Sequence, residues 1–337
     1  MRRSLVLAVI VSVTLAPLRA TADDPASATR STREGAPRSE RSEAAPREAA
    51  PREAVPREAE RVERPRTPRD ALRDIDTTEA VVGAAVGAAV LGAAYLPYPV
   101  HEAPQWRGGV LFDDSARGAL RLGTPSARDG ASAVSDVLVS TLVLAPVLID
   151  AVLVTWLMRG DAELMGRMLL MNLQAHAGAQ GLTTLFKHVV GRERPVARAC
   201  REELGTQASD PLCESRPDPD IPPASFFSGH SSLAFTSAAL ICLQHTQMGL
   251  YGPEGDATMC ATGMALATSV GLLRIAADRH YASDVLLGAA VGMLSGWLVP
   301  WLLHFDLAEA MGVEGASATI APIADDHQIG VQVMGTF

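Results

Sequence analysis

The chain has 337 residues, of which 48% are hydrophobic, and 29 basic residues against 38 acidic ones give it a net charge of −9. The acidic excess falls in residues 76–337 and no basic stripe runs through them, which argues against a nucleic-acid partner. The length allows one large domain or two small ones.

The first 22 residues have the pattern of a signal peptide. Two arginines, Arg2 and Arg3, precede an apolar stretch from Leu5 to Leu15, and Ala20-Thr-Ala22 has the small-x-small form of a cleavage site. We therefore expect export to the bacterial cell envelope. A retained N-terminal anchor of similar composition is the alternative.

Residues 23–75 form a second, polar segment. It carries 12 Arg and 12 Asp or Glu, and Pro-Arg-Glu-Ala repeats from Pro46, Pro51 and Pro56. Burial of its few apolar side chains cannot offset the entropy lost on ordering the chain. We therefore expect a disordered tether. An arm that binds the cell wall or a partner is the alternative.

Apolar segments of helical length follow one another through residues 76–305. We expect an all-α, six-helix bundle there, and a C-terminal tail, residues 306–337, in which Ala318–Ala324 and Ile329–Phe337 form a small β-hairpin. The six predicted helices are Glu79–Leu96, Ala133–Met158, Leu164–Val190, Ser228–Thr246, Thr258–Ala277 and Ser283–Phe305.

The bundle fits a membrane better than it fits water. Ala133–Met158 and Ser283–Phe305 are apolar enough to cross about 30 Å of hydrocarbon. Leu164–Val190, in contrast, holds polar residues such as Asn172 and His176, which are costly in lipid unless they face the bundle interior. We favour a membrane-embedded bundle, with a soluble periplasmic one as the alternative.

The end of the third predicted helix carries the first of three motifs. Lys187 is the only lysine of the chain and is followed by Arg194-Pro195. A lone lysine among so many arginines suggests a site that needs a compact ammonium group. Pro195 biases Arg194 away from helical geometry, which suits a helix that ends in a site. Taken singly, each cation could also cap a helix end.

The second and third motifs contain histidines. Ser228-Gly229-His230 opens a helix, where Ser228 can be the N-cap and the free amides can bind an anion. In Arg274-x5-His280-x3-Asp284, a helical turn would let the carboxylate bond one ring nitrogen and leave the other for phosphorus. An ordinary cap and a structural hydrogen bond are the alternatives. Together the motifs supply the fixed cations that phosphoryl transfer needs.

In this order and spacing, the three motifs resemble the type 2 phosphatidic acid phosphatase family, which includes vanadium haloperoxidases and bacterial acid phosphatases. The resemblance covers about residues 133–305 and implies no metal and no cofactor. It implies that His280 is the nucleophile, that Asp284 orients it, and that His230 is the general acid. The phosphoryl oxygens would be bound by Lys187, Arg194, Arg274, Ser228 and the Gly229 amide.

Two positions depart from the family pattern. Phe227 stands where the family usually has Pro, and Leu273 where it usually has Ser. Neither change removes an acid, a base or a nucleophile, so we expect activity to survive. The resemblance implies a metal-independent phosphatase that acts on a lipid or isoprenoid phosphate, or a small phosphomonoester, through a phosphohistidine. A non-catalytic lipid-phosphate or anion binder and a vanadium-dependent haloperoxidase are the alternatives.

The side of the membrane that bears the motifs depends on the first helix. A cleaved signal and six spans place the motif end in the cytoplasm, whereas it returns to the periplasm if Glu79–Leu96 does not cross. The arginines between the first two helices favour the cytoplasm. A disulfide between Cys200 and Cys213, for which two free thiols are the alternative, favours the periplasm. We expect an inner-membrane protein with its site facing the periplasm.

Overall fold

A computed structural model of the protein describes residues 72–96, 101–203, 222–305, 317–324 and 329–336. The signal peptide and nearly all of the tether predicted above lie outside the described residues. The chain divides into two compact units, and the helices belong to the unit that spans residues 65–317. Strands β1 (Ser317–Ala324) and β2 (Ile329–Thr336) pair in a two-stranded sheet.

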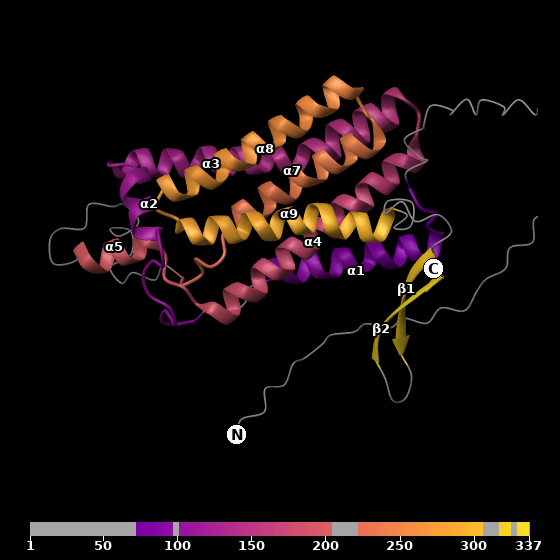
Figure 1. Ribbon diagram of the computed structural model, residues 1–337. Coiled ribbons are helices and arrows are strands. Elements are labelled where there is room, and N and C mark those ends of the chain that lie inside the picture. Colours follow the sequence, from indigo (N-terminus) through magenta and orange to yellow (C-terminus); the bar gives the residue numbers. More distant parts are fainter. Residues whose placement is uncertain (1–71, 97–100, 204–221, 306–316, 325–328, 337) are drawn as a thin grey trace, which may run out of the picture. The chain divides into compact units, whose positions relative to one another are not determined.

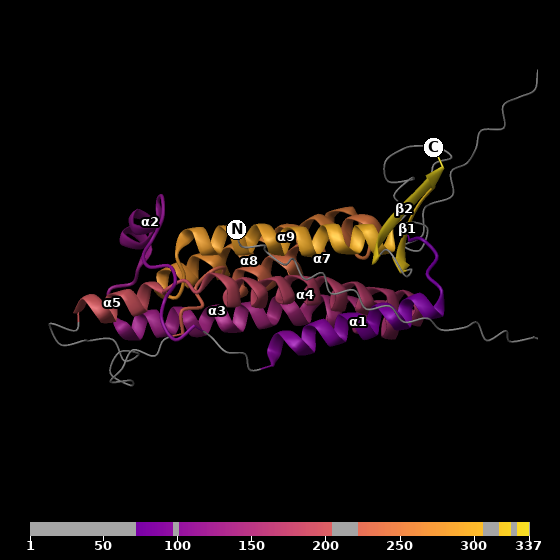
Figure 2. The ribbon, with the colours of Figure 1, turned by 90° about the horizontal axis from the view of Figure 1, so that it is seen from below.

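The helical unit is built mainly from long helices that alternate in direction (Figures 1 and 2). The helices of the described residues are α1 (Thr77–Tyr95), α2 (Asp113–Leu120), α3 (Pro125–Ala145), the π-helix η1 (Pro146–Met158), α4 (Ala162–Val190), α5 (Pro195–Glu203), α7 (Gly229–Met248), α8 (Pro253–Ala276) and α9 (Ala282–His304). Helix α7 lies at the centre, where it contacts α3, η1, α4, α8 and α9.

Each of the six predicted segments falls almost wholly within helical residues, and the structure adds detail that the pattern did not give. The segment predicted as one helix, Ala133–Met158, is divided between two helices. Helix α3 ends at Ala145, and the π-helix η1 begins at Pro146, which has no amide hydrogen to donate. Two short helices, α2 and α5, form in polar segments that were predicted as connections. The prediction of a six-helix bundle therefore omitted these two short helices.

A row of glycines on α9 lets that helix pack closely against α7. Gly288, Gly292 and Gly296 are spaced four residues apart and lie on one face. A Cβ atom at each would stand 2.2 to 2.5 Å from a backbone carbonyl oxygen of α7. The oxygens belong to Ser228, Ser232 and Thr236. Small residues of this kind allow the helix backbones to approach, as in membrane helix pairs.

The polar residues of α4 and α7 face the interior of the unit. Asn172 and His176 are buried on α4, and the His176 ring hydrogen-bonds Ser237 of α7 at 3.0 Å. The hydroxyl of Thr236 donates to the carbonyl of Ser232, one turn earlier. These side chains are therefore bonded inside the bundle, as their cost in lipid requires.

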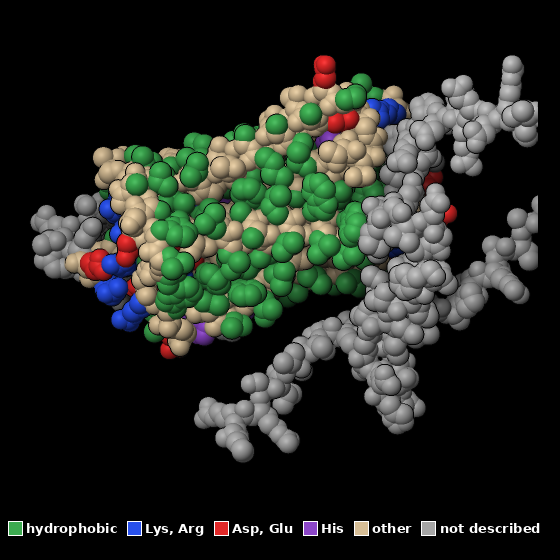
Figure 3. Space-filling model, in the orientation of Figure 1, with side chains coloured by type: hydrophobic (Ala, Val, Ile, Leu, Met, Phe, Trp, Pro, Cys, Tyr) green, Lys and Arg blue, Asp and Glu red, His purple; other side chains and the backbone are tan. Residues whose placement is uncertain are grey.

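Among the described residues, four helical stretches are long and apolar enough to cross a membrane. They are Thr77–Tyr95, Pro125–Met158, Pro253–Ala276 and Ala282–His304. On the face shown in Figure 3, apolar side chains cover the middle of the helices, whereas charged side chains gather at the end that holds α2 and α5. This distribution favours the membrane-embedded alternative over the soluble one.

The described part of the chain contains a disulfide that the sequence analysis did not predict. Cys242 of α7 and Cys260 of α8 are bonded, with an Sγ–Sγ distance of 1.98 Å. No spacing pattern indicated this pair, because the packing of neighbouring helices brings together two cysteines that are 18 residues apart. The predicted bond between Cys200 and Cys213 involves Cys213, which lies outside the described residues.

Candidate active site

The three motifs meet at one end of the helical unit. Lys187 lies in the last turn of α4, and Arg194 directly precedes α5. His230 lies in the first turn of α7 and Arg274 in the last turn of α8. His280 lies in the connection between α8 and α9. The alternating helix directions therefore gather residues from distant parts of the chain at the end where α2 and α5 also lie (Figures 1 and 2).

Two glycines shape the surroundings of Lys187. Gly191 ends α4 in the left-handed conformation, at φ 56°, and a Cβ there would meet the ring of His101. Gly229 places the ammonium group at the start of α7, because a Cβ built on Gly229 would be in ordinary contact with Nζ of Lys187, at 3.4 Å. Arg194 and Arg274 lie close enough for their charges to repel that of Lys187. The arrangement concentrates positive charge beside the start of α7.

Ser228 is the N-cap of α7, as predicted. Its hydroxyl accepts a hydrogen bond from the amide of Ser231 at 3.3 Å, and Gly229 is the first residue of the helix. The Ser228 amide itself donates to the carbonyl of Asp284 at 3.0 Å. The beginnings of α7 and α9 are thus joined through the backbone, and the α7 amides that can bind an anion lie beside the third motif.

The His280 ring is held by a backbone group. Its Nδ1 lies 2.8 Å from the carbonyl oxygen of Ser225, and a carbonyl can only accept, so Nδ1 carries the hydrogen. In the neutral ring, Nε2 then keeps its lone pair. Burial, together with the charges of Arg194 and Arg274, lowers the pKa of His280 to about 3 against the opposing effect of Asp284. The ring is therefore neutral at physiological pH.

Asp284 takes a different position from the one predicted. The prediction assumed a helical turn between His280 and Asp284, but α9 begins only at Ala282. The Oδ2 atom of Asp284 lies 3.8 Å from Nδ1 of His280, too far for a hydrogen bond. That oxygen instead accepts from the Ser225 hydroxyl at 2.6 Å and from the Tyr281 amide at 3.0 Å. Asp284 therefore acts on His280 through Ser225 and through its charge.

Arg192, which the sequence analysis gave no role, is the main partner of Asp284. It donates to Oδ1 of Asp284 at 2.5 Å and to Asp113 of α2 at 2.8 Å, and none of the three side chains is accessible to solvent. The rings of Trp106 and Tyr281 each lie 4.1 Å from the guanidinium carbon. The position of Arg192 inside the first motif was the signal that could have revealed it.

Asp136 of α3 is a second residue that the motifs did not reveal. Its Oδ1 lies 2.7 Å from Nε2 of His230 and 3.1 Å from Nη1 of Arg274. The same Arg274 nitrogen donates to Ser132 and Ser135 of α3. Asp136 directly precedes the apolar part of a candidate membrane span, where an unpaired carboxylate is costly, and this was the available signal.

These geometries agree with comparisons to known proteins. Residues 169–307 match the family model of the PAP2 superfamily. The resemblance seen in the motifs is thereby confirmed. The matched segment holds all three motifs, but it leaves out α1, α2 and α3. Asp136 and Asp113 therefore lie outside the matched segment, although their side chains contact His230 and Arg192 within it.

A curated relative and a solved structure extend the comparison. The lipid A 1-phosphatase of Porphyromonas gingivalis is 32% identical over 144 residues, which are 43% of this chain and 26% of that protein. This chain thus aligns with about a quarter of the relative's length. A transmembrane PAP2-type phosphatidylglycerolphosphate phosphatase from Bacillus subtilis is 18% identical, with a TM-score of 0.42 over 66% of this chain and 94% of that one.

The two departures from the PAP2 pattern lie beside the site. Phe227 is fully buried, and its ring centroid lies 5.4 Å from that of Phe186, the residue before Lys187. Leu273 is half-buried on α8 and offers no hydrogen-bond donor. Helix α7 still begins with Ser228 as its N-cap, although Phe227 precedes it.

Proposed function

We propose that the helical unit hydrolyses the phosphate ester of a lipid or isoprenoid phosphate without a metal, through a phosphohistidine. The observation that carries the proposal is the bond from Nδ1 of His280 to the Ser225 carbonyl, which leaves the Nε2 lone pair of a neutral ring. Lys187, Arg194 and Arg274 supply the positive charge that the phosphoryl oxygens need. The similarity to a lipid A 1-phosphatase supports a lipid substrate.

In the first step, Nε2 of His280 attacks phosphorus and the bond from phosphorus to the lipid oxygen breaks. His230, paired with Asp136, gives its proton to that oxygen, so that the lipid leaves as an alcohol. The cations and the amides at the start of α7 stabilise the charge on the three phosphoryl oxygens. Asp284 and Arg192 hold the loop that carries His280.

In the second step, water attacks the phosphohistidine and the phosphorus–nitrogen bond breaks. His230, now neutral, accepts a proton from the water, which restores both histidines. The products are inorganic phosphate and the lipid alcohol. Each ring therefore returns to its starting protonation state after one turnover.

Phosphate release by the purified protein, in buffer with a metal chelator, tests the proposal. We expect turnover of a lipid phosphate and its loss in His280→Ala. With p-nitrophenyl phosphate, whose leaving group needs no proton, His230→Ala should accumulate a phosphoenzyme. The trapped species should be acid-labile and alkali-stable, as expected for a phosphorus–nitrogen bond. Full turnover by His280→Ala contradicts the assignment, and binding of phosphate analogues without turnover favours the non-catalytic alternative.

We further propose that the bundle lies in the bacterial inner membrane with the motif end on the periplasmic side. Because α1 is one of the candidate spans and begins at the opposite end, this orientation requires the residues before α1 to stay in the cytoplasm, against the predicted cleaved signal. A disulfide within the helical unit supports an oxidising environment. Reporters fused directly after Phe305, which follows the far end of α9, test the orientation. A fluorescent protein should fold there and a periplasmic alkaline phosphatase should be inactive. The opposite pair of results places the site in the cytoplasm.

A further inference from the structure

The turn between α8 and His280 is built on Asp278. Its φ angle is 60°, in the left-handed region that glycine, asparagine and aspartate adopt more readily than other residues. This conformation turns the chain back onto the end of α8, where the carbonyl of Arg274 accepts from the amides of Arg279 and His280 at 3.1 and 3.3 Å. The backbone at Asp278 thus sets the position of the proposed nucleophile relative to a cation of the site.

The carboxylate of Asp278 is held by two arginines at the end of α2. Nε and Nη2 of Arg117 donate to its two oxygens at 2.6 and 2.7 Å, and Nε of Arg121 donates at 2.8 Å. The Asp278 side chain is inaccessible to solvent, and the two arginine side chains are 19% and 26% exposed. A bidentate fork fixes orientation as well as distance. Rotation of the turn would therefore break its contacts to α2.

Helix α2 also contacts the chain on the other side of His280. Asp113, the first residue of α2, accepts from the amide and the hydroxyl of Ser283 at 2.8 and 2.7 Å. The amide of Leu122, just after α2, donates to the carbonyl of Ala276 at 3.0 Å. The eight residues of α2 therefore bridge the end of α8 and the start of α9, between which His280 lies.

An in-line attack on phosphorus depends on such fixed positions. A misplacement of about 1 Å can lower the rate of a reaction about 100-fold. The His280 ring is bonded to the Ser225 carbonyl, but the backbone that carries the ring lies in a connection between helices, and connections are more mobile than helices. Contacts from α2 on both sides of His280 restrict that backbone.

We propose that Asp278 is a positioning residue for His280, and that Arg117 and Arg121 couple it to α2. The inference rests on the proposed function and adds to it, because α2 lies outside the segment that matches the PAP2 family model. The matched segment supplies the reacting groups, and α2 holds the turn that aligns one of them. Asp278 itself touches neither the phosphate nor the leaving group.

Asp278→Asn and Asp278→Gly separate the carboxylate from the backbone conformation. Asparagine and glycine both adopt positive φ angles, so the turn should still form. We expect kcat to fall about tenfold in Asp278→Asn, which keeps one acceptor, and about 100-fold in Asp278→Gly, which keeps none. Calorimetric titration with inorganic phosphate should give a Kd and a number of sites within about twofold of those of the unaltered protein. Partial unfolding would instead lower the number of sites together with kcat.

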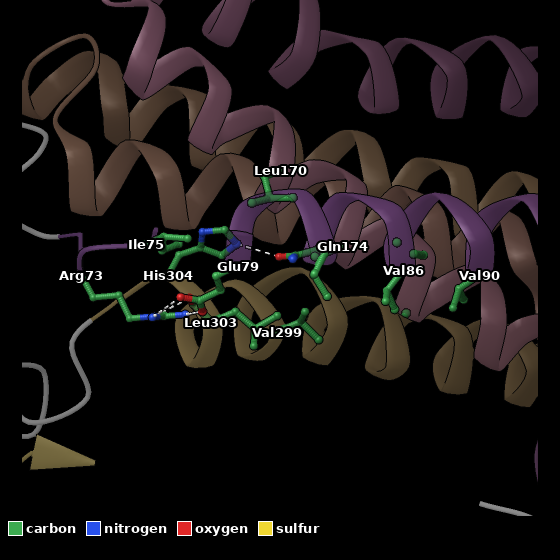
Figure 4. A pocket seen from close by; sticks show the side chains of 15 residues that line it. Arg73, Ile75, Glu79, Val86, Val90, Leu170, Gln174, Val299, Leu303 and His304 are labelled. Carbon is green, nitrogen blue, oxygen red and sulfur yellow. Dashed lines mark hydrogen bonds and ion pairs between the residues drawn. The ribbon is translucent and has the colours of Figure 1, made fainter. Parts of the chain in front are cut away.

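Arg117→Gln tests the same contact from the side of α2. It should lower kcat about tenfold, and combined with Asp278→Gly it should lower kcat no further than Asp278→Gly alone, because both changes break one contact. Glu79→Gln is the control. Glu79 pairs with Arg73 at the end of the helical unit away from the motifs (Figure 4). Its loss should leave kcat unchanged.

Three results overturn the inference: unchanged kcat in both Asp278 variants, additive losses in the combined variant, or a loss of phosphate sites that matches the loss of kcat. In each of them the unaltered protein is active, so the proposed function stands. An unaltered protein that hydrolyses no phosphate ester contradicts the proposed function, and the inference falls with it.

Discussion

Arg192 contacts the carboxylate of Asp284 at 2.5 Å, and neither side chain is accessible to solvent. The same guanidinium also contacts Asp113, so two buried carboxylates depend on one cation. Breaking a buried ion pair by removing one partner costs about 3–5 kcal/mol. Arg192 is therefore a positioning residue: it acts on His280 through Asp284 and the loop before α9.

Arg192→Met should lower the melting temperature sharply and remove activity, because it leaves both carboxylates uncompensated. Arg192→Lys should stay folded, because lysine keeps the charge. Its kcat should fall while KM changes little, because lysine lacks the planar guanidinium that contacts the rings of Trp106 and Tyr281. Thermal melting and phosphate release measure the two effects. Arg201→Lys, at a half-exposed ion pair with Glu193, is the matched control. Equal effects at Arg192 and Arg201 contradict the assignment.

Asp136→Asn should lower kcat by about 10- to 100-fold, within the contribution that general acid catalysis makes. The carboxylate stabilises the protonated form of His230, so its loss moves the basic side of the pH–rate profile to lower pH. The profile of kcat measures this. Asp129→Asn, at a half-exposed acid on the same helix, should leave the profile unchanged. An unshifted profile in Asp136→Asn shows that the pair has no part in proton transfer.

Lys187→Arg should lose most of its turnover although the charge is kept. Nζ of Lys187 lies at the start of α7, and arginine would replace this compact ammonium group by a larger planar fork whose donors lie in different positions. Lys187→Met, which removes the charge, should be at least as impaired. The measurement is phosphate release at saturating substrate. Full activity of Lys187→Arg would show that the site does not require a lysine at this position.

Gly292→Ala should destabilise the helical unit, because its Cβ would stand 2.3 Å from the carbonyl oxygen of Ser232. Either α7 or α9 would have to move. Gly166→Ala is the control, since nothing lies within 4 Å of a Cβ at that helical position and alanine favours helix. The melting temperature in detergent should fall for Gly292→Ala and hold or rise for Gly166→Ala. A fall of equal size in both variants contradicts the close-packing argument.

The sequence was informative wherever a pattern is local. Apolar runs located the long helices, and the order of the motifs placed Lys187, Ser228 and Arg274 at helix ends. The prediction for Asp284 was wrong in detail because it rested on a spacing of four and assumed that the turn was helical. Where a helix begins is set by capping, and here Tyr281 takes the cap position.

The residues that the sequence did not reveal are those that act across elements. Asp136 reaches His230 from a helix 94 residues away in the chain, and Asp113 reaches Arg192 over 79 residues. No spacing rule links such pairs, because packing of whole helices brings them together. The bond between Cys242 and Cys260 was missed for the same reason.

The close pairing of α7 and α9 also bears on how this site can diverge. Ser228 is fixed by its bond to the Asp284 carbonyl and by the approach of Gly288, both of which are backbone contacts. The relative placement of the two histidine-bearing segments is therefore independent of the side chain at residue 227. The buried ring of Phe227 packs against Phe186, so a change at this position can alter the surroundings of the neighbouring Lys187. Substrate preference and catalytic geometry are in this way free to evolve separately.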